Sequence, residues 1–186
     1  MTPIERISEI LQADGYEPTL SDVEGHDPAR CPLIVPFRPD HIGREMALLV
    51  EVLPRDEEDA VTLIQFALIY PFEIAETEKL PELLRALFLL NRLLPVGSHG
   101  LCEQTPAIYF HYQLPVSDAE YLEESVITEV VNMIGLTTRR HGAFIRQILA
   151  GETTCDDLLE ELLLTGVNLP PLFARTIRES ATTVED

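Results

Sequence analysis

The stretch LPELLRALFLLNRLL, residues 80–94, predicts a helix that is apolar on nearly every side. Pro81 is accepted in the first turn of a helix, whereas a proline further along would break it, and Pro95 and Gly97 mark its end. A helix that is apolar around most of its circumference has to bury two faces. One face can cover a β-sheet. The other needs a second layer, which either a partner subunit or the chain's own C-terminal helices would supply.

Three strands are predicted on the N-terminal side of this helix, at residues 33–38, 44–53 and 60–70. Pro36 favours an edge position for the first strand, because proline has no N–H to give to a sheet. The second strand alternates between two sides, as strands in a sheet do. The third is mostly apolar on both sides, which favours a central place. The short charged connection before it predicts an antiparallel hairpin.

Two further strands are predicted after the helix, at residues 99–103 and 107–114, the second of which alternates clearly. At the other end of the chain, Thr2 and Glu5 match the capping box that opens a helix. The polar, turn-rich residues 17–32 that follow this first helix are interpreted as loop or sheet edge.

The C-terminal part of the chain is predicted to be helical. A second capping box, Ser117 and Glu120, opens a helix that Gly135 either ends or kinks. A following helical segment stops at Gly151, and a last helix starts two or three residues further on.

The order of these elements predicts an α+β fold with an antiparallel sheet of about five strands packed against helices. The predicted order is α-β-β-β-α-β-β-α, with extra C-terminal helices. Residues 1–151 are expected to form one domain, and residues 152–186 a helical extension packed on or near its core. A chain of 186 residues buries roughly 70% of its unfolded surface, so its core needs no disulfide or metal.

The chain is strongly acidic, with 13 basic and 32 acidic residues and a net charge of −19. Proteins bind nucleic acids by neutralising phosphates, so this charge argues against DNA or RNA as a partner. Anionic membrane surfaces are disfavoured for the same reason. The acidity either only keeps the protein in solution or also steers a basic partner towards it.

The cysteines and the hydropathy pattern indicate a cytoplasmic protein. Cys31, Cys102 and Cys155 are odd in number and far apart, which is not a disulfide framework and suits a reducing compartment. The N-terminus lacks the long apolar run of a secretory signal. No stretch reaches the 18 consecutive apolar residues typical of a membrane span.

The central helix and the hairpin after it are similar to a known family. Residues 89–97, LLNRLLPVG, which run into Leu101–Glu103 and Ile108–Phe110, resemble the corresponding part of YbjN-like proteins, which share the type III secretion chaperone-like fold. The resemblance covers roughly residues 1–135. It implies a small acidic protein, often a homodimer, with an antiparallel sheet facing helices and no established chemistry. Secretion chaperones of this shape bind an extended segment of a client protein.

No catalytic motif is found, so the chain is predicted not to be an enzyme and to hold no cofactor or metal. Phosphate-binding loops, GxSxG nucleophile elbows, HExxH and CxxC are all absent. The best metal-like cluster is His99, Cys102 and Glu103. On a strand, however, His99 and Glu103 would face one side and Cys102 the other, which separates the ligands.

Two polar groups have open alternative interpretations. His111 lies between Phe110 and Tyr112, and is either an interface residue that titrates near neutral pH or a hydrogen-bonded side chain on the wetter face of the sheet. In an enzyme with an unfamiliar pocket, His111 would be the candidate base. The basic cluster Arg139, Arg140 and His141 either binds an acidic group or pairs internally with Glu123, Glu124 or Glu129.

The function predicted from these patterns is a non-enzymatic protein-binding module, chaperone-like or regulatory, which forms a homodimer. It would act through an acidic surface and an apolar helix interface. The alternatives are a structural subunit of a larger assembly docked through residues 152–186, and less favoured, an enzyme with an unrecognised pocket. The residues predicted at the partner or dimer interface are Leu83, Leu84, Leu87, Phe88, Leu90, Tyr109 and His111.

Overall fold

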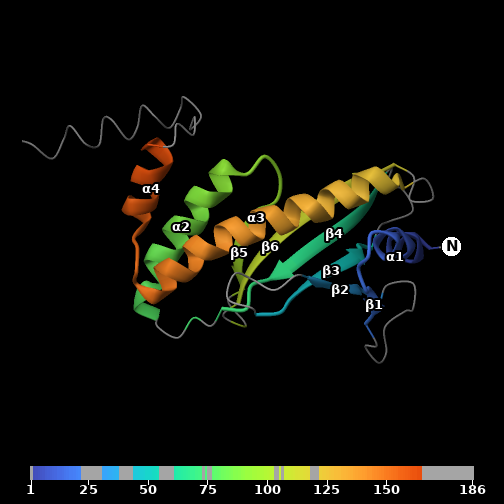
Figure 1. The fold of residues 1–186 in the computed structure, drawn as a ribbon, viewed down its shortest axis with the longest axis horizontal. Coiled ribbons are helices and arrows are strands. Elements are labelled where there is room, and N and C mark those ends of the chain that lie inside the picture. The colour runs from blue at the N-terminus through green and yellow to red at the C-terminus, as the bar shows by residue number, and fades with distance from the viewer. Residues whose placement is uncertain are drawn as a thin grey trace, which may run out of the picture.

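A computed structural model describes residues 2–21, 31–37, 44–54, 61–72, 74, 77–102, 105, 107–117 and 122–164. Over these residues the chain is an α+β fold built on one antiparallel sheet, which confirms the predicted fold class (Figure 1). The helices are α1 (Pro3–Ala13), α2 (Leu80–Leu93), α3 (Glu124–Ala150) and α4 (Cys155–Leu164), with a 3-10 turn η2 (Thr77–Lys79) before α2. The strands are β1 (Thr19–Leu20), β2 (Leu33–Phe37), β3 (Met46–Val52), β4 (Thr62–Ile69), β5 (Ser98–Cys102) and β6 (Ala107–Val116).

The described sheet has six strands in the order β1-β2-β3-β4-β6-β5. The strand beyond the predicted five is β1, a two-residue pairing with Leu33 and Ile34 inside the segment interpreted as loop or edge. The predicted hairpin of β3 and β4 is present, and β4 lies between β3 and β6, the central place that its apolar faces predicted.

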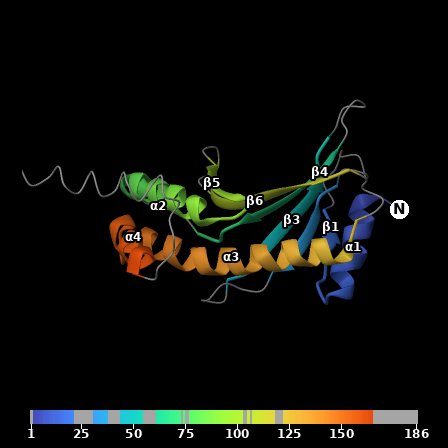
Figure 2. The ribbon, with the colours of Figure 1, turned by 90° about the horizontal axis from the view of Figure 1, so that it is seen from above.

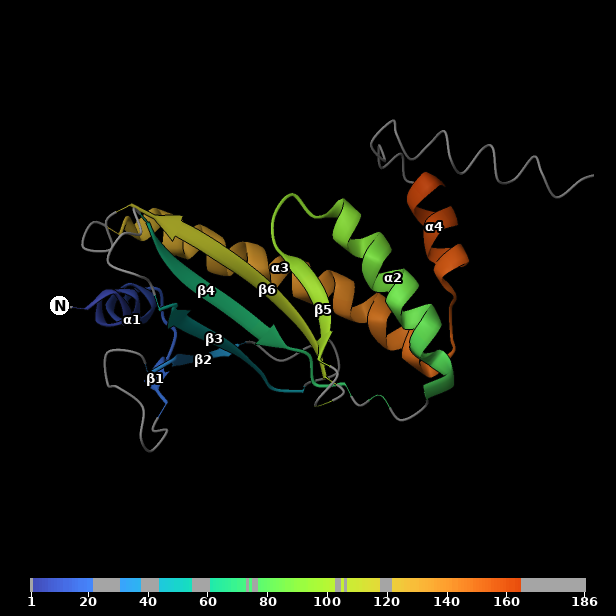
Figure 3. The same cartoon turned by 180° about the vertical axis from the view of Figure 1, so that it is seen from behind.

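The two faces of the sheet differ in what covers them. Alternate residues of β2, β3, β4 and β6 point to one face, where most of them are buried, Leu48, Phe66 and Phe110 completely. The helices α1 and α3 pack against this side (Figure 2). Seen from the opposite side, no described helix crosses the strands (Figure 3). The intervening residues of each strand therefore form an uncovered face, which we call the open sheet face.

Helix α3 is a single element of 27 residues, about 40 Å long at 1.5 Å per residue. The prediction that Gly135 ends or kinks it was wrong. Gly135 is buried in mid-helix against the ring of Phe37, and a Cβ at this position would lie 2.8 Å from Phe37 Cε1. This glycine gives an aromatic side chain room rather than ending the helix.

The start of α3 also differs from the prediction. Its N-cap is Glu123, without a side-chain capping bond, so the helix begins later than the predicted Ser117–Glu120 capping box. Glu120 itself lies outside the described residues. The end of α3 agrees with the prediction, because Gly151 takes the left-handed conformation that a helix C-terminus favours.

Helix α2 obtains its second covering layer from its own chain. Leu83, Ala86, Leu87, Leu89 and Leu90 are buried, and α2 packs against α3, α4 and β5. Of the two sources left open by the sequence, the C-terminal helices therefore supply this layer. The first turn of α4 is tied to α2 by side-chain bonds as well as by burial: Arg85 bridges to Asp156 at 2.8 Å, and Glu82 accepts from the backbone N–H of Cys155.

Over the described residues, each edge of the sheet has a feature that limits pairing with another strand. The side-chain amide of Asn91 in α2 bonds to both backbone groups of His99, accepting from its N–H at 2.6 Å and donating to its C=O at 2.9 Å. The amide thus occupies the outer edge of β5 as a further strand would. At the other edge β1 is only two residues long, and Pro36 in β2 has no N–H to offer.

The helix starts at Thr2 and Thr154 are fixed by reciprocal capping bonds. The predicted capping box of α1 is present, with Thr2 and Glu5 each accepting from the other's backbone N–H. At α4, Thr154 Oγ1 accepts from the N–H of Asp157 at 3.1 Å, and Asp157 Oδ2 accepts from the N–H of Thr154 at 2.8 Å. The Thr154 hydroxyl also donates to Asp157 Oδ2 at 2.7 Å, and this bond, together with the one from the Thr154 N–H, holds the pKa of the Asp157 carboxyl below its usual value.

Candidate functional site

The seven residues predicted at an interface fall into three places. Leu83, Leu87 and Leu90 belong to the core and contact the chain's own layers. Leu84 and Phe88 are on the solvent side of α2, with 46% and 66% of their surface exposed. Tyr109 and His111 are half-buried on the open sheet face. Whether any of them contacts a partner stays a prediction, but only the last four are placed where a partner could reach them.

Leu84 and Phe88 form the most apolar exposed surface of α2, which we call the α2 patch. They are one helical turn apart and therefore lie side by side. The buried residues of α2 occupy the opposite side of the helix, so the patch points away from α3 and α4. Arg85 also lies on the exposed side, where it is paired with Glu82 and Asp156, whereas Arg92 is half-buried.

The open sheet face continues from β6 to β5 on the side nearest α2. The ring of Tyr109 lies over Gly100, where a Cβ would come within 2.4 Å of Tyr109 Cζ. His111 is the next residue on this face of β6, with its ring centroid 5.7 Å from that of Tyr109 and its Nδ1 3.4 Å from Ser98 Oγ. The glycine in β5 therefore lets the tyrosine lie flat across two strands.

A polar row borders these aromatic residues on the same face. Gln65 Nε2 donates to Glu51 Oε1 at 2.7 Å, and Gln113 Nε2 donates to Gln65 Oε1 at 3.1 Å. Glu51, Gln65 and Gln113 are directly opposite one another on β3, β4 and β6. The open sheet face is thus apolar in part and hydrogen-bonded in part, as the surface of a protein that meets water and partners is.

A buried pair of histidines joins β5 to α3, and the sequence did not point to it. His99 and His141 are 5% and 8% exposed, and His99 Nε2 lies 2.8 Å from His141 Nδ1. On its other side, His99 Nδ1 lies 3.4 Å from the hydroxyl of Tyr70. Burial lowers the pKa of His99 to about 3, with a further effect of His141, and lowers that of His141 to about 4, with a further effect of Arg140.

Both rings of this pair can stay neutral while the two nitrogens that face each other share a hydrogen bond. One imidazole N–H donates to the lone pair of the other ring, and the Tyr70 hydroxyl completes the chain. If both rings gained a proton, two N–H groups would face each other across 2.8 Å. Burial also raises the pKa of Tyr70 above its usual value. The arrangement is a neutral, packed core network that links the sheet to α3.

The predicted polar clusters are separated in the structure. His99 points to the covered face of β5 and Cys102 to the open one, as the alternation predicted, and Glu103 lies outside the described residues. Over the residues described, no three His, Cys, Asp or Glu side chains gather as metal ligands would. None of the described helices is long and apolar enough to cross a bilayer.

The predicted pairing of the basic cluster with nearby glutamates was wrong. Because α3 is one continuous helix, Glu129 and Arg139 are ten residues, about 15 Å, apart along it. Arg139 Nε donates instead to the C=O of Gly135, and His141 is buried against His99. A kink at Gly135 would have been needed to bring these side chains together.

Comparison with protein-family models gives no match for this chain, and comparison with curated proteins gives none either. The resemblance to YbjN-like proteins therefore stays a prediction.

Proposed function

We propose that this chain is a non-enzymatic protein-binding module, chaperone-like or regulatory, and that the α2 patch is its principal contact. The observation that carries the proposal is the exposure of Phe88 and Leu84 on a helix whose other sides are already packed. A phenylalanine with 66% of its surface in water gains free energy when another molecule covers it. Aromatic anchors of this kind dominate the binding energy of protein interfaces.

Two side chains are too few to make a stable interface. A specific interface buries about 800 Å² on each partner, so the contact has to continue onto neighbouring surface. Tyr109 and His111 on the open sheet face supply aromatic surface on the β6–β5 side next to α2. The Asn91 amide at β5 and the short β1 with Pro36 at the other edge disfavour a partner that binds by adding a strand. A partner that packs its side chains onto these surfaces fits better.

The partner proposed first is a second copy of this chain. Two copies that each carry a charge of −19 repel each other, and the repulsion is weakest where the local charge is least negative. Helix α2 carries two basic residues, Arg85 and Arg92, and one acidic residue, Glu82. Its own charge is therefore positive, although Arg85 is paired with Glu82 and Asp156, and this makes α2 a more favourable place than the rest of the chain for two acidic copies to meet. A cytoplasmic location remains part of the same proposal.

Replacing Phe88 with glutamate should separate the dimer while the protomer stays folded. The new carboxylate would lie in the centre of the contact and would lose its water there, which strongly disfavours association. Sedimentation should give the mass of two chains for the native protein and one for Phe88→Glu. Higher salt should strengthen the native dimer, because it screens the repulsion between the copies. Glu160→Gln on the exposed side of α4 is the control and should stay dimeric.

The dimer proposal would fail if the native protein sedimented as a single chain at micromolar concentration. It would also fail if Phe88→Glu kept the native mass. In the first case a different polypeptide would have to cover the patch, and the binding function would need support from a partner identified by its contact with residue 88.

The alternative of a structural subunit docked through residues 152–186 has a specific difficulty. Residues 155–164 form α4, which buries Cys155, Leu158 and Leu162 in the common core. Deleting everything after residue 151 should therefore expose apolar surface of α2 and lower the melting temperature, and deletion after Leu164, which keeps α4, should lower it less. Thermal unfolding of the two shortened chains distinguishes packing by α4 from docking by the residues that follow it.

A further inference from the structure

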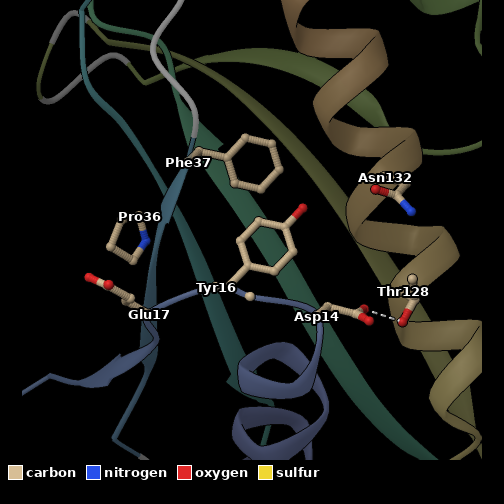
Figure 4. Close-up of a pocket in the computed structure, with 8 residues that line it drawn as sticks. Asp14, Tyr16, Glu17, Pro36, Phe37, Thr128 and Asn132 are labelled. Atoms are coloured by element: carbon tan, nitrogen blue, oxygen red, sulfur yellow. Dashed lines mark hydrogen bonds between the residues drawn. The ribbon is translucent and has the colours of Figure 1, made fainter.

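A recess of ≈ 520 Å³ lies between the end of α1, strand β2 and α3, on the helix side of the sheet (Figure 4). A smaller recess of ≈ 180 Å³ shares Tyr16, Phe37 and Asn132 with it and also touches Arg139. The α3 residues that line the two recesses include Thr128, Asn132, Gly135 and Arg139. These residues follow one side of the helix, so the two recesses form one groove along α3.

Aromatic side chains form the middle of this groove. The rings of Tyr16 and Phe37 are stacked, with centroids 6.1 Å apart and planes inclined by 23°. Phe37 can lie close to α3 only because Gly135 has no Cβ. The hydroxyl of Tyr16 and the side-chain amide of Asn132 both lie beside the rings, from opposite walls (Figure 4). They offer hydrogen bonds next to an aromatic surface.

The end of the groove at α1 is electrically negative from three sources. Asp14 and Glu17 line it, and Asp14 is the C-cap of α1, where the helix dipole is negative. The hydroxyl of Thr128 donates to Asp14 Oδ2 at 2.5 Å and fixes its direction. A carboxylate at a helix C-terminus is unfavourable for the helix itself. Residues that are unfavourable for the helix or strand that carries them are often found at binding sites.

The combination of negative charge and aromatic rings selects the chemistry of a ligand. Cations are attracted to aromatic faces, and a planar guanidinium both stacks on rings and bonds to carboxylates. We propose that the α1 end of the groove receives the arginine side chain of a partner polypeptide, stacked on Tyr16 or Phe37 and paired with Asp14. Glu17 lies on the other side of Tyr16 and adds negative charge to this end without pairing directly (Figure 4). This proposal rests on the proposed function as a protein-binding module, but it involves a different surface from the α2 patch.

Arg139 sets the limit of the cationic site. It is seven residues beyond Asn132 in α3, about 10 Å along the helix axis. Its positive charge repels an arginine side chain from that end and confines it to the end with Asp14. Removing a negative charge at one end and the positive charge at the other should therefore change the affinity for arginine in opposite directions.

The proposal is tested with two small probes of equal shape. N-acetyl-L-arginine methylamide carries the guanidinium, and N-acetyl-L-citrulline methylamide is its neutral counterpart. Each is titrated into the full chain labelled with nitrogen-15, and the amide signals of Gly15, Asn132 and Gly135 are followed. The arginine probe should bind about fivefold more tightly than the citrulline probe, as a cation against rings and carboxylates does.

Variants at the two ends give the matched comparison. Asp14→Asn should weaken binding of the arginine probe by about threefold, which is typical of an exposed charge pair, and Glu17→Gln should weaken it less, because its charge acts from a greater distance. Arg139→Gln should strengthen it, and Glu160→Gln on α4 should leave it unchanged. Asp14→Asn should also raise the melting temperature, since it removes a charge opposed to the α1 dipole while Thr128 keeps an acceptor.

Three results would overturn the proposal. Equal binding of the citrulline probe would leave only an uncharged aromatic recess. Weakening by Arg139→Gln would mean an anion site, and weakening by Glu160→Gln would mean attraction by the overall charge. None of these three results bears on the α2 patch, because Phe88→Glu tests that surface separately, through sedimentation. Conversely, a monomeric native protein that binds the arginine probe would separate the two sites.

Discussion

Leu87→Glu is expected to unfold the protein, whereas Phe88→Glu, one residue further along α2, should leave its stability nearly unchanged. Leu87 is 3% exposed and packs in the common core, while Phe88 is 66% exposed. A carboxylate at position 87 would lose its water without gaining a charged partner, and the leucine packing would be lost as well. Together these cost roughly 5 kcal/mol, comparable with the whole stability of a small domain. For the protomer itself, a surface substitution such as Phe88→Glu falls within about 0.5 kcal/mol, so the comparison is made at low protein concentration, where the dimer contact adds little stability.

Chemical unfolding followed by circular dichroism measures this difference. The expected result is a cooperative transition for Phe88→Glu near the native midpoint and no native baseline for Leu87→Glu. Leu87→Met is the matched control, since it keeps the volume and apolar character of the side chain and should cost less than about 1.5 kcal/mol. A stable Leu87→Glu protein would mean that α2 buries a different side from the one described here.

The second large effect is a loss of stability in acid that the buried histidines cause. In the unfolded chain both imidazoles titrate near pH 6.5. In the folded chain the pKa is about 3 for His99 and about 4 for His141, because burial disfavours the charged ring. Between pH 6.5 and 4 the unfolded chain therefore binds protons that the folded chain does not. The free energy of unfolding should fall as the pH falls through this window, by about 1.4 kcal/mol per pH unit for each histidine.

This direction is the opposite of what the net charge alone would give. As carboxylates are protonated, the charge of −19 shrinks and the repulsion within the folded chain becomes weaker. Carboxyls with a lowered pKa, such as Asp157, also lose stability in acid, but near and below their usual pKa of about 4. A slope towards lower stability between about pH 6.5 and 5 therefore points to the histidines. Urea unfolding at half-unit steps should show a much smaller slope for the double variant His99→Gln/His141→Gln. His111→Gln is the control for loss of a histidine that lies outside the buried pair. An unchanged slope in the double variant would assign the effect to other groups.

Sequence patterns predicted correctly those helices and strands whose form and burial follow from their own residues, without knowledge of contacts to distant segments. The alternation in residues 60–70 was enough to place β4 in the centre of the sheet, because both of its sides are apolar. The caps at Thr2 and Gly151 are local chemistry, and both were predicted correctly. The leucines of residues 80–94 indicated that α2 needs two covering layers, which it has, but a count of leucines cannot say which chain provides the second one.

What the sequence could not predict depends on contacts between distant segments. His99 and His141 are 42 residues apart and meet only because α3 runs uninterrupted past Gly135 beneath β5. A glycine in a helix pattern looks like a break unless its aromatic neighbour, here Phe37, is known. The groove near Asp14 had one signal, a carboxylate at the end of a helix, and its rings come from two elements that the sequence does not place together.

The claim on which the proposed function depends is that residue 88 lies against another polypeptide. Its most direct test replaces Phe88 by the photoreactive aromatic p-benzoylphenylalanine and irradiates the purified chain. Covalent joining should give a species of twice the chain mass with the link at position 88, and the same replacement at Glu160 should give none. Irradiated protein that keeps the mass of one chain at position 88, or that joins equally well from position 160, would contradict the account.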